Sequence, residues 1–166
     1  PDRSSSLSDF ESARTRLKSV SRECQLHLDR LNHAQQKLAG RFPLSVEDWQ
    51  NLDNDTISHL DQLLFRFGRL QDTIGQRLFR HLLELSLEWD DSEPFIDKLS
   101  RLERLSIIPS AEQWLILREL RNSAMHEYPD QPELTVANLN RIHDAAEPLA
   151  RIFHAADRFA AGLLGN

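Results

Sequence analysis

The stretch that decides the fold runs from Thr56 to Leu82 and reads TISHLDQLLFRFGRLQDTIGQRLFRHL. Its large apolar residues recur at steps of three and four, the spacing that places side chains on one face of an α-helix. This stripe is continuous, so it predicts a long helix that starts between Asp53 and Thr56 and buries one face in the core. The residues of the stripe are Ile57, Leu60, Leu64, Phe67, Leu70, Ile74, Leu78 and Leu82.

Two glycines, Gly68 and Gly75, lie inside this stretch, seven residues apart and on nearly the same face. Each costs roughly 1 kcal/mol relative to alanine in a helix interior. A close crossing with another helix would explain both residues, and this is the interpretation that we favour. A functional bend is the alternative.

Another long helix is predicted before this stretch. Residues 1–6 are polar and are expected to form a disordered tail. The helix should begin near Ser8, with Glu11 at the capping-box position, and end near Leu38, just before Gly40. It is unusually polar, which predicts one face that is open to solvent or to a partner.

The remaining elements are shorter, apart from a last long helix. Apolar spacing, capping residues and prolines set their expected limits. They are a helical turn at 45–49, an amphipathic helix at 95–105, a helix from the N-cap Ser110 to a stop before Pro129, and a last helix at 134–163 with a kink at Pro148.

Signals for β-strands are nearly absent, because the chain holds five glycines and no hairpin dipeptide between alternating apolar residues. Long helices joined by short links are typical of bundles. The sequence therefore predicts an all-α protein, an up-and-down helical bundle of about five helices. Residues 7–166 are expected to form a single domain.

Composition restricts the possible functions. The 166 residues carry a formal net charge of −6, whereas a nucleic-acid-binding domain usually has a strong basic excess. Any contact with RNA would therefore need a local basic patch. The single cysteine, Cys24, excludes an internal disulfide and a cysteine-based zinc site, and it fits a cytoplasmic location. No apolar run approaches the ~20 residues of a membrane span, so no membrane partner is expected.

A second informative stretch, ELRNSAMHEYP at residues 119–129, is expected to end a helix. Arg118, Asn122 and His126 follow one another at steps of four, which places them on one strip of a helix surface. Arg121 and His126 would converge best where His126 leaves the regular helix, which the closing proline favours.

These residue types suit phosphodiester chemistry. An imidazole gives or takes a proton near neutral pH, Arg121 can hold a phosphate through its planar fork, and Asn122 can orient the ring of His126. RNA supplies its own nucleophile, the ribose 2′-OH, so neither a metal nor a cofactor is expected. The alternative is a helix-end histidine and arginine that bond backbone carbonyls.

Arg121-x4-His126-x-Tyr128 resembles the R-x4-H-x-Y motif of HepT-like toxins, which belong to the HEPN superfamily with its R-x4-6-H signature. The stretch Arg69–Gly75 and the spacing of Trp114, Leu117 and Arg118 ahead of Arg121 also resemble this group. The resemblance covers about residues 55–130. An isolated R-x4-H would be weak, but RNSAMHEYP at a helix end in an all-helical chain is fairly specific.

The resemblance implies a homodimer in which two motifs face each other across the interface and form one cleft. It implies a metal-independent endoribonuclease that leaves a 2′,3′-cyclic phosphate and a 5′-hydroxyl, with RNA as the substrate and tRNA among the candidate RNAs. It also implies a partner, a minimal nucleotidyltransferase antitoxin that inactivates the toxin by transferring AMP to the motif tyrosine. That position is Tyr128, the only tyrosine of the chain.

Further residues carry predictions with open alternatives. Asp72 matches a polar position that HEPN proteins often carry on the facing helix, although it could instead pair with Arg69 or Gln76. A basic stripe beside the motif could bind an RNA backbone; a solvated helix face with acidic partners is the alternative. The stripe consists of Arg66, Arg69, Arg77 and Arg80.

The histidines other than His126 are interpreted as solvated side chains on helix surfaces; they are His27, His33, His59, His81, His143 and His154. Two functions compete with the ribonuclease. One is a non-catalytic partner of a nucleotidyltransferase, whose main event is modification of Tyr128. The other is a helical dimerisation domain with a decayed motif.

Overall fold

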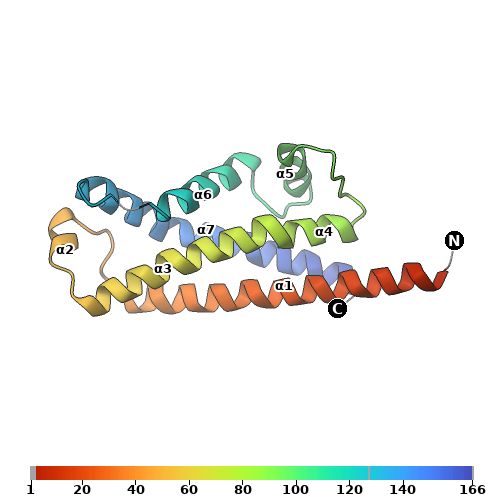
Figure 1. The fold of residues 1–166 in the computed structure, drawn as a ribbon, viewed down its shortest axis with the longest axis horizontal. Helices are drawn as coiled ribbons and strands as arrows, with labels where there is room; N and C mark the ends of the chain where they lie inside the picture. The colour runs from red at the N-terminus through yellow and green to blue at the C-terminus, as the bar shows by residue number, and fades with distance from the viewer. Residues whose placement is uncertain (1–2, 127, 166) are drawn as a thin grey trace. The chain divides into compact units, whose positions relative to one another are not determined.

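The computed structural model describes residues 3–126 and 128–165, and in this part of the chain every regular element is a helix (Figure 1). The protein is therefore an all-α helical bundle, as the sequence predicts. The elements are α1 (Arg3–Lys37), α2 (Val46–Gln50), α3 (Asn54–Thr73), the π-helical turn η1 (Ile74–Leu78), α4 (Phe79–Leu85), α5 (Phe95–Arg104), α6 (Ala111–Ala124) and α7 (Pro132–Leu164).

The chain divides into two compact units, and the long helices contribute to both. Unit 1 holds Pro1–Gln25, Asp72–Trp114 and Arg151–Asn166, and unit 2 holds Leu26–Gln71 and Leu115–Ala150. The sequence predicted one domain at 7–166 and did not indicate this division.

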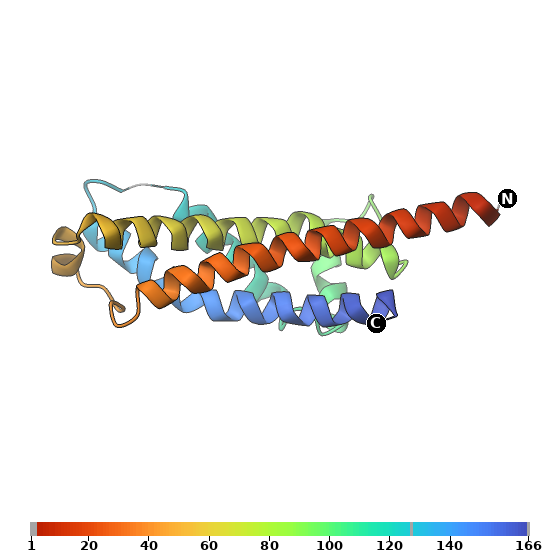
Figure 2. The same ribbon diagram turned by 90° about the horizontal axis from the view of Figure 1, so that it is seen from below.

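Unit 1 is built on the first part of α1, on η1, α4 and α5, and on the last part of α7. Its largest buried side chains include Phe79, Trp114 and Phe153, and the rings of Phe79 and Trp114 lie 4.7 Å apart between centroids. The first part of α1 lies beside the last part of α7, where Ser21 donates a hydrogen bond to Asp157 (Figure 2).

Unit 2 is built on the end of α1, on α2 and most of α3, on α6 from Leu115 onward and on the first part of α7. Leu31, Leu63, Phe67 and Leu117 are buried in its core. The loop after α1 is tied to α7 by Asn140, whose Oδ1 accepts from the Leu44 amide at 2.8 Å and whose Nδ2 donates to the Leu44 carbonyl at 3.0 Å.

The starts of α2 and α6 follow the predicted capping residues, whereas the predicted cap Ser8 lies inside α1. Ser45 caps α2 in a capping box with Asp48, and Ser110 Oγ accepts from the Gln113 amide at 3.0 Å at the start of α6. Helix α1 ends at Lys37 as expected, but it begins at Arg3, inside the segment that was predicted as a disordered tail. Helix α7 includes Pro148 without a break.

The predicted close approach is confirmed at Gly75. A Cβ atom at Gly75 would lie 2.8 Å from Cζ2 of Trp114, closer than real Cβ atoms come to such neighbours. A Cβ at Gly68 would lie 3.9 Å from Cγ of Arg121, which is an ordinary van der Waals contact. Gly75 also belongs to the π-helical turn, which the apolar stripe gave no reason to expect.

Candidate functional site

The motif stretch leaves the helix where the sequence predicts. Helix α6 ends at Ala124. The next two amides donate to carbonyls three residues earlier instead of four: Met125 to Asn122 at 3.3 Å and His126 to Ser123 at 3.2 Å. Bonds of this i→i+3 kind commonly close the last turn of a helix. His126 therefore lies outside the regular helix and is exposed.

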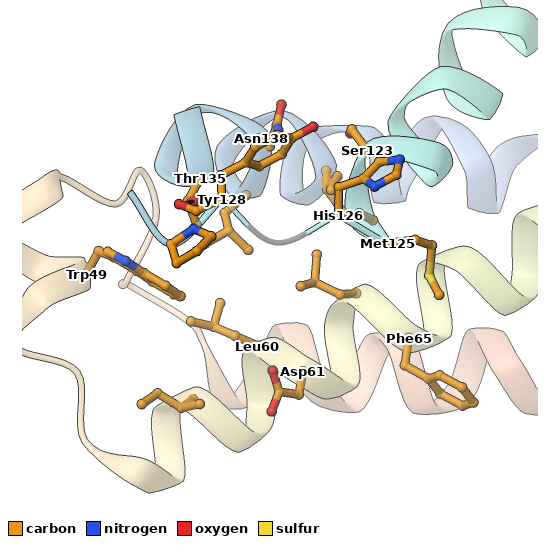
Figure 3. A pocket seen from close by; sticks show the side chains of 16 residues that line it. Trp49, Leu60, Asp61, Phe65, Ser123, Met125, His126, Tyr128, Thr135 and Asn138 are labelled. Carbon is orange, nitrogen blue, oxygen red and sulfur yellow. Dashed lines mark hydrogen bonds between the residues drawn. The ribbon is translucent and has the colours of Figure 1, made fainter. Parts of the chain in front are cut away.

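His126 and Tyr128 line the same pocket of unit 2, which has a volume of about 580 Å³. Their rings lie 6.4 Å apart between centroids, at an angle of 55°. Figure 3 shows both residues on one side of the pocket, with Leu60, Asp61 and Phe65 of α3 on the other. The remaining lining residues are Trp49, Ile57, Leu64, Ser123, Ala124, Met125, Pro129, Thr135, Asn138, Leu139 and Ile142.

The start of α7 holds the backbone of Tyr128. Its carbonyl oxygen accepts a hydrogen bond from the Gln131 amide at 3.0 Å and another from Thr135 Oγ1 at 3.3 Å. Thr135 also lines the pocket, so these bonds fix the tyrosine at the edge of the cavity. The side chain of Tyr128 is half-buried.

Arg121 and Asn122 are placed differently from the other two motif residues. Arg121 Nη1 donates to Asn122 Oδ1 at 3.3 Å, and neither residue is among those that line the pocket in the described part of the chain. The expected role of Asn122 was to orient the imidazole, but its side-chain oxygen accepts from Arg121. Within one chain, His126 and Tyr128 thus line the pocket, whereas Arg121 and Asn122 do not.

The supporting residues Asp72 and Arg118 do not line the pocket either. Arg118 is an exposed residue of α6 in unit 2. Asp72 is half-buried near the end of α3 and belongs to unit 1.

Part of the predicted basic stripe is neutralised. Arg77 Nη1 lies 2.5 Å from Glu23 Oε2, and Arg80 Nε lies 2.8 Å from Glu84 Oε1. The hydrogen bond to Glu84 raises the pKa of Arg80. For these two arginines, the alternative of a helix face with acidic partners is correct.

His27 corrects the view of the remaining histidines as solvated residues. It is 5% exposed, and its Nδ1 lies 2.9 Å from Nη1 of Arg66. Nothing in the spacing of the polar first helix distinguishes His27 from the exposed His33, because the partner of His27, Arg66, lies on α3.

Sequence reasoning also missed most of the pocket wall. Asp61 and Phe65 lie one helical turn apart next to the apolar stripe, and this spacing was a usable signal. Trp49 and Asn138 come from distant parts of the chain, and no local pattern joins them to His126. The two motif residues were found because their types and spacing suggested chemistry.

In the described part of the chain, no group of three or more His, Cys, Asp or Glu side chains is placed to hold a metal ion. Among the same residues, no helix is both long and apolar enough to cross a membrane. The chain matches no family model, no curated protein and no solved structure.

Proposed function

We propose that this protein is the toxin of a toxin–antitoxin pair of the HEPN type, a metal-independent endoribonuclease that is neutralised when a nucleotidyltransferase antitoxin transfers AMP to Tyr128. The observation that carries the proposal is the pairing of His126 with Tyr128 at the edge of one pocket, just beyond the helix that carries Arg121. An exposed imidazole beside a cavity can reach a bound strand. A cytoplasmic location is part of the proposal.

The proposed reaction is an internal transfer within RNA. The imidazole of His126 takes the proton of the ribose 2′-OH. The 2′ oxygen then forms a bond to phosphorus, and the bond between phosphorus and the 5′ oxygen breaks. A second proton donor protonates the leaving 5′ oxygen. Arg121 stabilises the charge on the phosphate oxygens. The products are a 2′,3′-cyclic phosphate and a 5′-hydroxyl.

This reaction needs a second copy of the chain. In one chain Arg121 does not line the pocket that His126 lines, and a second proton donor is also required. The side chains of Leu115, Ile116 and Met125 on or just after α6 are 41%, 44% and 61% exposed. A homodimer that covers these apolar side chains would bring two copies of the motif together.

The proposal is tested by incubating the purified protein with RNA in the presence of EDTA. The wild-type protein should cut the RNA, and His126→Ala should not. His154→Ala is the matched control, because His154 is an exposed histidine of α7 far along the chain from the motif, and it should cut like the wild type. A His126→Ala protein as active as the wild type would refute the assignment.

Modification of Tyr128 would act as a switch through the bulk and the charge of the added group. An AMP group adds a bulky anion to a ring that lies 6.4 Å from the ring of His126, so it would fill the mouth of the pocket and repel a substrate phosphate. Co-expression with the nucleotidyltransferase encoded beside this gene should add AMP to Tyr128, detected by mass spectrometry. Tyr128→Phe should stay active and escape neutralisation; neutralisation of this variant by the antitoxin would contradict the switch.

One observation favours a second candidate, a non-catalytic partner of a nucleotidyltransferase. Arg121 bonds to Asn122 and both stay outside the pocket, whereas Tyr128 lies at its edge. For such a partner, Tyr128 would be modified while the unmodified protein leaves RNA intact. The two candidates are therefore separated by the same two assays.

A further inference from the structure

Two arginines of unit 2, Arg30 and Arg66, form no ion pair with any carboxylate of the described residues. Arg66 of α3 is half-buried, and Arg30 of α1 is exposed. We call Arg30 and Arg66 the arginine patch.

The contacts of Arg66 position its guanidinium without neutralising it. A guanidinium only donates hydrogen bonds, so the His27 nitrogen at 2.9 Å must accept, which assigns the ring proton of a neutral His27 to Nε2. Cζ of Arg66 also lies 5.1 Å from the centroid of the Phe65 ring. Both contacts leave the full positive charge in place.

The surroundings of Arg66 are unfavourable to that charge. Burial lowers the pKa of Arg66, and the nearby charges of Arg30 and Arg69 lower it further. A cation in such a position is stabilised by a bound anion, since an anion offsets both the lost hydration and the repulsion. Arg77 and Arg80, later in the same helical stretch, already have this compensation from Glu23 and Glu84.

The aromatic neighbour indicates what kind of anion fits. Phe65 is 54% exposed, touches Arg66 with its ring, and lines the pocket that contains His126. Proteins bind single-stranded nucleic acid through such pairs, in which a cation contacts the phosphate and an aromatic ring stacks on the base. Arg66 therefore borders the pocket through Phe65.

We infer that Arg66, beside the exposed ring of Phe65, binds a backbone phosphate of single-stranded RNA together with Arg30, and that the neighbouring nucleotide enters the pocket of His126. The identity of the strand rests on the proposed function. The patch supplies the local basic surface that an acidic protein needs to hold RNA.

The test measures binding of a fluorescein-labelled oligouridine to the full-length His126→Ala protein in EDTA, over a range of salt concentrations. Arg30→Gln should weaken binding on the order of fivefold and reduce the slope of log affinity against log salt by about 0.7, the value for one phosphate contact on a single strand. Phe65→Ala should weaken binding with little change in that slope. Arg77→Gln is the matched control, with the same loss of charge at a paired arginine, and should bind like its parent.

Arg30 is the main test position because it is exposed, whereas Arg66→Gln would remove the bond to the buried His27 and lower stability. Arg30→Glu provides a second variant, and thermal unfolding checks that each variant is folded. The inference is overturned if the parent protein does not bind the oligouridine, or if Arg30→Gln and Arg30→Glu bind like Arg77→Gln. It is also overturned if inorganic phosphate alone competes as well as unlabelled oligouridine does.

Failure of the ribonuclease proposal has a different signature. In one case the wild-type protein leaves RNA intact, but the Arg30→Gln change still weakens the binding of oligouridine to the His126→Ala form. The patch then binds RNA and the protein lacks the ribonuclease activity. If the wild-type protein cuts RNA but its His126→Ala form binds oligouridine equally well with and without the Arg30→Gln change, the activity is present and the patch does not bind RNA.

Discussion

Substitution of Gly75 by alanine tests the closest packing in the structure. The added Cβ would lie 2.8 Å from Cζ2 of Trp114, well inside the ~3.5–4.0 Å separation at which two carbon atoms attract each other best. Trp114 has little room to move, since it is 1% exposed and its ring packs against Phe79 at 4.7 Å.

The magnitude follows from two opposing effects. Overpacking a core by a methyl group costs typically ~1–3 kcal/mol, and the exchange of glycine for alanine in a helix gains roughly 1 kcal/mol. Because the tryptophan is held on several sides, we expect the upper part of the first range and a net loss of about 1–2 kcal/mol in the free energy of unfolding. Gly68→Ala has only an ordinary contact at 3.9 Å, so it should gain up to about 1 kcal/mol.

Urea unfolding followed by circular dichroism measures both changes. The double variant Gly75→Ala/Trp114→Phe should lose less stability than the sum of the two single changes, because the smaller ring leaves space for the methyl group. The reasoning is refuted if Gly75→Ala is as stable as Gly68→Ala, since the short distance to Trp114 would then have no effect on stability.

Three other predictions concern elements that support the pocket or the core. Ser110→Ala removes the acceptor for the Gln113 amide at the start of α6 and should lower the free energy of unfolding in urea by about 1 kcal/mol. Ser100→Ala, on the exposed face of α5, is the control and should change it little. Asn140→Ala removes both bonds to the buried backbone of Leu44 and should cost on the order of 2 kcal/mol; an unchanged unfolding midpoint would show that the loop is held by other contacts. Burial, helped by the charge of Glu23, raises the pKa of Cys24 from 9.0 to about 12, so the unfolded chain releases this proton first as the pH rises. The stability that Cys24 contributes is present below pH 9 and is lost between 9 and about 12; Cys24→Ala should lack this part of the alkaline decline, and parallel curves for the two proteins would contradict it.

The long central helix was predictable because its apolar residues form one stripe over many turns, and that pattern depends only on local spacing. The π-helical turn within it was not, since its sequence, Ile74–Leu78, keeps the same apolar stripe and gives no local signal for the turn. The early start of α1 at Arg3 lies in a polar segment, where the pattern carries no signal.

The candidate site divides in the same way. The departure of His126 from the helix followed from Pro129, and its neighbour Tyr128 is only two positions away in the sequence. The pocket wall required long-range packing of α2, α3 and α7 against this loop. His27 was misjudged for the same reason, because its hydrogen-bond partner, Arg66, lies on another helix.

The most direct test of the central claim is the chemistry of the cut ends. An RNA oligonucleotide and its fully 2′-deoxy counterpart are incubated with the wild-type protein in EDTA, and the fragments are identified by mass spectrometry. The proposed mechanism predicts that only the RNA is cut, that the 5′ fragment carries a 2′,3′-cyclic phosphate, and that His126→Ala yields no fragments. Cleavage of the deoxy oligonucleotide, or RNA fragments that never pass through a cyclic phosphate, would contradict it.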